Sequence, residues 1–296
     1  MLYSTRLLHS LAFYVVGLFL VTFGWRLRDL QTQMASKRII PLSQTWSKLK
    51  ETYYRGDALA CDLRLINCVA LMFSVFINLK HLIPLINPHL LDRKFAGWEM
   101  SLFDGQTVGE HLQLWLGADA AYYLSPFYTF FYTYVALILY YIIFTKRYAQ
   151  EFLALFCLLW FLGVLTVYAV PTWGPIFFVP ELYSALPHTV VTDLQQRLID
   201  HQQYLALHPY SEKGVYLISG FPSLHLAVPI LGSIYLWRLN RLIGGLSWSF
   251  VIITILTTLY FGWHWLADDL GSVLLVGILL LMKMIIPTRA RSWSNA

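Results

Sequence analysis

The stretch that decides the fold runs from Pro222 to Ile286 and reads PSLHLAVPILGSIYLWRLNRLIGGLSWSFVIITILTTLYFGWHWLADDLGSVLLVGILLLMKMII. It contains three apolar runs, Pro222 to Trp237, Leu242 to Trp263 and Leu266 to Ile286, which are separated by two short polar breaks. A helix crosses the hydrocarbon core of a bilayer in about 20 residues. Each run is therefore predicted to cross a membrane as a helix.

Four further apolar runs lie earlier in the chain, at Leu7 to Trp25, Leu65 to Ile86, Pro126 to Phe144 and Phe152 to Val170. No small-residue cleavage site follows the first run, so we interpret it as a membrane span rather than a signal peptide. Apolar residues make up 58% of the chain and charged residues 12%, which is too little charge for the surface of a soluble protein of this length. The sequence predicts an all-α, polytopic membrane bundle of six or seven transmembrane helices.

The basic residues predict how this bundle is oriented. Four segments that alternate along the chain hold eight, two, two and three of the 21 lysines and arginines: Arg26 to Arg64, Lys146 and Arg147, Arg238 to Arg241, and Lys283 to Arg291. The opposite side keeps six. Because basic loops remain in the cytoplasm, the first side is expected to be cytoplasmic, with the N-terminus outside. No basic face interleaved with aromatic residues lies outside the membrane, so we expect no nucleic-acid partner.

Two external loops follow from this orientation. Residues 87–124 carry several glycines among aromatic residues and are expected to lie on the membrane as short helices. Four prolines interrupt the first part of residues 171–219, at positions 171, 175, 180 and 187. After them, Val191, Leu194 and Leu198 recur at helical spacing. This second segment is predicted to form either a lid or a simple surface helix.

Two histidines are expected to lie at the same depth on the external side. His225 and His264 are separated by 39 residues, with the basic turn Arg238 to Arg241 between them. One crossing takes about 20 residues, so a chain that leaves the external surface at His225 returns to it at His264. Ionisable residues at such positions are functional candidates.

Asp268 is expected to be the partner of His264. In a helix, residues four apart share a face, whereas Asp269 points about 100° away. A carboxylate on one ring nitrogen selects the tautomer and leaves the other nitrogen available as a nucleophile or base. The same three side chains, His225, His264 and Asp268, are also conceivable metal ligands.

A helix start just before His225 predicts an anion site. Pro222 suits the first turn of a helix, and Ser223 suits a cap. Unpaired backbone N–H groups at a helix N-terminus bind anions. A phosphate held there would face both histidines.

The segments Pro222-Ser223-x-His225 and His264-x-x-x-Asp268 resemble the second and third motifs of the type 2 phosphatidic acid phosphatase superfamily. The resemblance implies that His264 attacks phosphorus, that Asp268 orients it, and that His225 protonates the leaving oxygen. It also implies a phosphatase-like catalytic membrane core at residues 125–287, preceded by N-terminal membrane helices and interfacial loops at residues 1–124.

The sequence departs from that superfamily at the basic residues that bind the phosphate. The usual first motif, a lysine followed by Arg-Pro, is absent, and Thr257-Thr258 stands where Ser-Arg is usual. The same gap occurs in the branch similar to inositol phosphorylceramide synthases, and residues 102–105 and 168–175 also resemble that branch.

Other groups are therefore expected to meet the charge of the phosphate. Ser223 and the helix N-terminus are two of them, and the cations on the same side are candidates for the rest. Lys213 is preferred, because it lies ten residues before Ser223, and the alternatives are Arg197, Arg93 and Lys94.

The predicted function is phosphoryl transfer from a lipid phosphate or phosphodiester at the extracytoplasmic face of an integral, multi-pass membrane protein. It proceeds through a phosphohistidine, with no metal and no other cofactor. Water as acceptor makes the enzyme a phosphatase, and an alcohol makes it a phosphotransferase; the sequence does not decide between them, nor does it indicate an oligomeric state.

A membrane transporter or channel with a histidine proton relay is the alternative function. That alternative requires polar residues along a pore near the midplane. Here the ionisable pair lies at the ends of spans, and the neighbouring spans carry almost no other charge. The enzyme is therefore the preferred reading.

The orientation makes a first prediction. A cysteine introduced by Ser184→Cys is expected to react with an impermeant thiol reagent applied to intact cells, because residue 184 lies in an external loop. A cysteine introduced by Ser36→Cys is expected to react only after permeabilisation. The reverse pattern of labelling would place the histidines on the cytoplasmic side.

Overall fold

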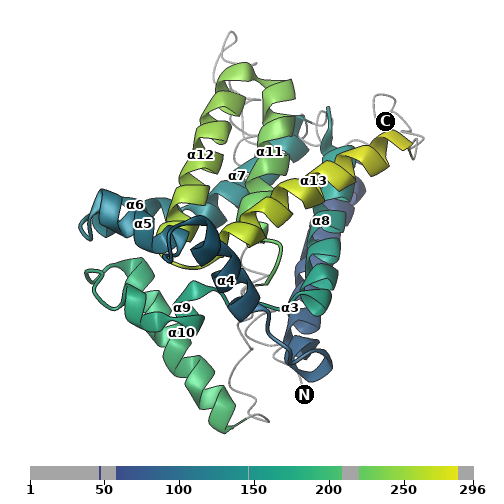
Figure 1. Cartoon of the computed structure of the whole chain (residues 1–296). Helices are drawn as coiled ribbons and strands as arrows, with labels where there is room; N and C mark the ends of the chain where they lie inside the picture. Colours follow the sequence, from purple (N-terminus) through teal and green to yellow (C-terminus); the bar gives the residue numbers. More distant parts are fainter. Residues whose placement is uncertain (1–46, 48–57, 146, 209–219, 286–296) are drawn as a thin grey trace.

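A computed structural model describes residues 47, 58–145, 147–208 and 220–285, and every regular element in this part of the chain is a helix (Figure 1). The predicted all-helical class is confirmed. The elements, in chain order, are α3 (Ala58–Ile86), α4 (Asp92–Leu102), α5 (Val108–Leu116), α6 (Ala120–Thr129), α7 (Phe131–Thr145), α8 (Ala149–Ala169), α9 (Pro175–Phe178), the 3-10 helix η1 (Pro180–Tyr183), α10 (Val190–Leu207), α11 (Leu224–Leu239), α12 (Arg241–Tyr260) and α13 (Leu266–Ile285).

Among the described residues, four helical segments are long and apolar enough to cross a membrane: Asn67–Pro84 in α3, Ala120–Ile143 across α6 and α7, Ala149–Ala169 and Arg241–Tyr260. Helix α11 is apolar but shorter. Helix α13 carries two aspartates in its first turn and a lysine in its last. These helices are compatible with a multi-pass membrane protein, while the number of spans stays a prediction. The predicted span Leu7 to Trp25 lies outside the described residues.

Helix α11 is the centre of the bundle. It packs against α12, α13, α7 and α8, and most of its residues are buried. Helix α3 lies along α8, away from α12 (Figure 1). Because side chains of α11 are covered on several sides, the first turn of this helix, which carries His225, has a defined position relative to its neighbours.

Short helices gather at one end of the bundle, where α11 and α13 begin and α12 ends (Figure 1). Residues 87–124 form α4, α5 and the start of α6, as expected for this loop. Helices α5 and α10 each begin with a capping box, at Thr107 and Thr189. Helix α10 follows the proline-rich segment and contains the predicted apolar positions. The span expected to start at Pro126 instead starts at Ala120 and is divided at Phe130.

The other end of the bundle carries basic residues around one carboxylate. Glu151 of α8 accepts hydrogen bonds from Lys283 of α13 and from Tyr235 of α11, and it lies 3.8 Å from the Arg238 guanidinium. This cluster joins three helices at the end opposite the short helices. The separation of the two ends matches the asymmetry that the basic residues show in the sequence.

Candidate active site

The turn at residues 261–265, between α12 and α13, is the backbone on which the candidate site is built. The carbonyl of Gly262 accepts a hydrogen bond from the N–H of Ile176 at 2.8 Å. The carbonyl of Phe261 accepts one from Nε2 of Gln195 at 2.5 Å. Segments from α9 and α10 therefore hold the turn from outside the bundle.

Two glycines make this close packing possible. Gly262 has φ +67°, and a Cβ at this position would lie 2.2 Å from the ring of Tyr183. Gly174 has φ +92°, and its Cβ would lie 2.4 Å from the carbonyl oxygen of Trp263. Because other residues rarely adopt these backbone conformations and have no room for a side chain, the approach of the two loops requires glycine at both positions.

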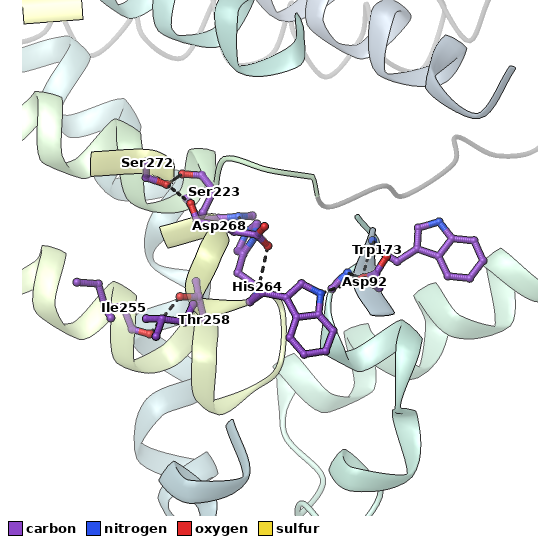
Figure 2. A network of polar contacts seen from close by, with 12 residues as sticks. Asp92, Trp173, Ser223, Ile255, Thr258, His264, Asp268 and Ser272 are labelled. Atoms are coloured by element: carbon purple, nitrogen blue, oxygen red, sulfur yellow. Dashed lines mark hydrogen bonds and ion pairs between the residues drawn. The ribbon is translucent and has the colours of Figure 1, made fainter. Parts of the chain in front are cut away.

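His264 and Asp268 lie in contact, with Nδ1 of the imidazole 3.2 Å from Oδ2 of the carboxylate (Figure 2). The backbone N–H of Trp265 donates to the same oxygen at 3.1 Å. His264 precedes the first residue of α13 and is not helical, whereas Asp268 lies in the first turn of that helix. The histidine is 2% exposed and the aspartate 0% exposed. A carboxylate is stabilised at this position by the N-terminal end of the helix.

His225 completes a chain of three side chains. Its Nδ1 lies 3.2 Å from Nε2 of His264. If Nδ1 of His264 carries the proton that Asp268 accepts, Nε2 of His264 accepts the hydrogen bond from His225. The structure thus brings together the three residues that the sequence singled out, with the second ring nitrogen of His264 facing His225.

Aromatic rings pack around His225. The centroid of its ring lies 4.7 Å from that of Phe131 and 5.7 Å from that of Tyr128. Tyr128 in turn stacks on Trp263, at 5.2 Å and an interplanar angle of 6°. These rings limit the rotation of His225 and give the site one apolar wall.

Ser223 lies at the N-cap of α11, but its hydroxyl does not cap the helix. Its N–H donates to the carbonyl of Asp268 at 3.0 Å, and its carbonyl accepts from the Ser272 hydroxyl at 2.6 Å. In the described part of the chain, Oγ of Ser223 has no hydrogen-bond partner. The expectation that Pro222 occupies the first turn was wrong, because the helix begins at Leu224, two residues later.

Several carboxylate oxygens beside Ser223 are also buried. Oδ1 of Asp268 and both carboxylate oxygens of Asp269 lack hydrogen-bond partners among the described residues. Asp268, four residues after His264, is the carboxylate that contacts its imidazole.

The structure leaves the predicted phosphate-binding role of Lys213 and its alternatives untested. Arg93, Lys94 and Arg197 are exposed, and Lys213 lies outside the described residues. The hydroxyls of Thr257 and Thr258 both donate to the carbonyl of Thr254 within α12, so neither is directed to a phosphate.

Lys80 of α3 is a cation that the sequence analysis did not select. It interrupts an apolar span, and this was the signal that could have identified it. Burial, together with the positive charge of Lys80, lowers the pKa of His264 to about 3. The charge of Lys80 acts on His225 as well. His264 is therefore neutral at physiological pH, as a nucleophile has to be.

Comparison with protein families gives one match: the PAP2 superfamily profile covers residues 105–282, which is more than half of the chain. The chain belongs to the PAP2 superfamily. Members of the PAP2 superfamily are generally phosphatases, which supports an enzyme with a phosphatase-type function. Comparisons with curated proteins and with solved structures give no match. The matched region contains Ser223, His225, His264 and Asp268, whereas Lys80 precedes it.

The low pKa of His264 makes a prediction about stability. The unfolded chain takes up a proton on this histidine below pH ~6.5, while the folded protein does not until about pH 3. The unfolding free energy is therefore expected to fall as the pH falls from about 6.5, by about 2 kcal/mol at pH ~5. Thermal unfolding in detergent across this range measures the effect. His264→Gln, which cannot take up the proton, is expected to show a smaller dependence; equal dependence in both proteins would contradict the prediction.

Proposed function

We propose that the protein is an integral membrane lipid-phosphate phosphatase or phosphotransferase that acts through a phosphohistidine on His264. The observation that carries this proposal is the chain from His225 to His264 to Asp268, with two contacts of 3.2 Å. In the described part of the chain, no three His, Cys, Asp or Glu side chains are arranged to hold a metal ion. The constellation is therefore better suited to nucleophilic than to metal chemistry.

In the first half of the reaction, Nε2 of neutral His264 attacks phosphorus and the bond to the leaving oxygen breaks. Asp268 accepts the Nδ1–H of His264 throughout and stabilises the positive charge that develops on the ring. His225, which is protonated in the substrate complex because the bound phosphate is negatively charged, donates that proton to the leaving oxygen and becomes neutral. Because His225 and His264 are hydrogen-bonded to each other, the phosphoryl group has to take the place of that bond when substrate enters.

In the second half, the acceptor attacks phosphorus and the bond from phosphorus to Nε2 breaks. Neutral His225 takes the proton of the acceptor, which returns both histidines to their starting states. Water as acceptor releases phosphate, whereas an alcohol yields a new phosphoester. The resemblance of residues 102–105 and 168–175 to inositol phosphorylceramide synthases suggests that a lipid hydroxyl is one acceptor.

The location of the site supports a lipid substrate. The histidines lie where α11 begins and α12 ends, at the end of helices that are apolar along their length. A lipid headgroup at the interface would reach this level while its chains remain in the bilayer. The basic cluster around Glu151 lies at the opposite end, which supports an extracytoplasmic site.

We further infer that Lys80, with Ser223 and the N-terminus of α11, meets the charge of the phosphate. Lys80 is half-buried and forms no ion pair with a carboxylate in the described residues. Next to it, the carbonyl of Leu79 accepts a hydrogen bond from the Tyr168 hydroxyl at 2.5 Å. Ile83, three residues after Lys80, is buried against Val167 of α8.

The same part of α8 also contacts the segment that leads into α11. A Cβ on Gly220 would lie 2.5 Å from Val167, and the side chain of Leu224 packs on Gly163. The ends of α3 and α8 and the start of α11 thus meet beside His225. This arrangement supports a role for Lys80 at the phosphate, because a preorganised cation stabilises the negative charge of the transition state.

A phosphohistidine intermediate on His264 leads to predictions about turnover and about labelling of the protein. With a panel of lipid phosphates in vesicles, His264→Ala and Asp268→Asn are each expected to lower turnover by about a hundredfold or more, because the nucleophile or its orienting partner is lost. Brief exposure to labelled substrate is expected to leave acid-labile, base-stable phosphate on the protein. Release of phosphate measured against transfer to an added alcohol identifies the acceptor.

His188→Ala is the matched control, since the side chain of His188 is 98% exposed, and it is expected to keep normal turnover. Activity is expected to survive chelation, and vanadate is expected to inhibit. Loss of activity on chelation with recovery on added zinc or magnesium would show that His264 and Asp268 are ligands instead.

Lys80 has its own prediction. Lys80→Met keeps the length of the side chain but removes its charge, and it is expected to lower kcat/KM by about ten- to a hundredfold. Lys80→Arg is expected to keep most of the activity, and Lys94→Met, at an exposed cation, is expected to change little. Normal kcat/KM in a folded Lys80→Met protein would remove Lys80 from the phosphate site.

A further inference from the structure

Two buried carboxylates lie on one face of the short helix α4. Asp92 and Glu99 are each 1% exposed and are separated by two helical turns. The neighbouring cations Arg93 and Lys94 are exposed, and neither carboxylate forms an ion pair in the described part of the chain. Both acidic side chains therefore face the protein rather than solvent, where their partners are N–H groups.

Asp92 joins two segments that are distant in the sequence. Its carboxylate accepts hydrogen bonds from the backbone N–H groups of Trp173 and Gly174, each at 2.9 Å (Figure 2). It also accepts one from the indole Nε1 of Trp265 at 2.9 Å. Trp265 is the residue that follows His264, and its own backbone N–H donates to Asp268.

Glu99 holds the next residue of the same turn. Oε1 of Glu99 accepts the backbone N–H of Leu266, the first residue of α13, at 2.5 Å. Its Oε2 accepts the N–H of Val108, the first residue of α5, at 3.1 Å. Together the two carboxylates bind the two residues that directly follow His264.

Burial of these groups is costly, which argues for a role beyond packing. Burial raises the pKa of both Asp92 and Glu99, and the N–H donors act in the opposite direction. A buried charge without a cation is a poor source of stability compared with an apolar side chain of similar size. A buried carboxylate does fix the orientation of the groups that donate hydrogen bonds to it, because each oxygen accepts bonds only from donors at defined positions.

We propose that Asp92 and Glu99 are positioning residues of the catalytic centre, which hold Trp265 and Leu266 so that His264 stays directed at both Asp268 and His225. This inference rests on the proposed function for its kinetic consequence. Both residues precede residues 105–282, the region that matches the PAP2 superfamily.

The test compares Asp92→Asn and Glu99→Gln with Asp119→Asn, whose carboxylate is exposed in the same part of the chain. Each amide keeps the shape of the side chain but replaces one acceptor oxygen with an N–H group, which opposes the donors already present. We expect kcat per folded molecule to fall about ten- to a hundredfold with little change in KM, because small displacements of a reacting group have effects of this size. A role confined to folding would lower the amount of folded protein and leave kcat unchanged.

A second measurement needs no substrate. Diethyl pyrocarbonate modifies accessible imidazoles, and His264 is 2% exposed, so its peptide is expected to be modified slowly in the wild-type protein. Modification of His264 is expected to be at least several times faster in Asp92→Asn and Glu99→Gln, whereas the exposed His188 reacts at the same rate in all variants and serves as the internal standard.

The two readouts separate this proposal from the proposed function. If the wild-type protein transfers no phosphoryl group but His264 still becomes reactive in both variants, the proposed function fails and the positioning role stands. If His264 stays protected and kcat equals that of Asp119→Asn, Asp92 and Glu99 do not position the histidine, whatever reaction it performs.

Discussion

Three buried carboxylates, those of Asp268, Asp92 and Glu99, accept hydrogen bonds from the segment 264–266, which carries His264. Asp268 accepts from the imidazole and from the backbone N–H of Trp265. Asp92 accepts from the indole of Trp265, and Glu99 from the N–H of Leu266. One short turn is thus tied to its own helix and to a helix more than 160 residues earlier. The position of His264 depends on these bonds.

The long helices and the short helices contribute differently to the geometry of the histidines. The long apolar helices bring His225 and His264 to the same end of the bundle, since α11 begins and α12 ends there (Figure 1). They do not by themselves determine how the rings face one another. That orientation comes from the short helices α4, α9 and α10, whose side chains and backbone bind the turn at residues 261–265.

The matched core and the preceding helices also contribute differently to the proposed chemistry. Residues 105–282 contain the histidines and Asp268. Lys80 and the two carboxylates of α4 come from earlier residues, and the sequence lacks the basic motifs usual in the superfamily. A cation from α3 would compensate for that loss, because the phosphate requires positive charge but not a particular origin in the chain.

The helical class, the placement of His225 and His264 side by side, and the pairing of His264 with Asp268 could all be predicted from the sequence. These follow from helix rise, bilayer thickness and residue spacing, which are local or one-dimensional quantities. Only the folded structure gives the start of α11 at Leu224, the electrostatic effect of Lys80 on His264, and the partners of Asp92 and Glu99. Most of the donors to Asp92 and Glu99 are backbone N–H groups, and two of the bonds span 173 and 167 residues. Since almost every residue has a backbone N–H, such contacts leave no signal in residue type and appear only when the chain is folded.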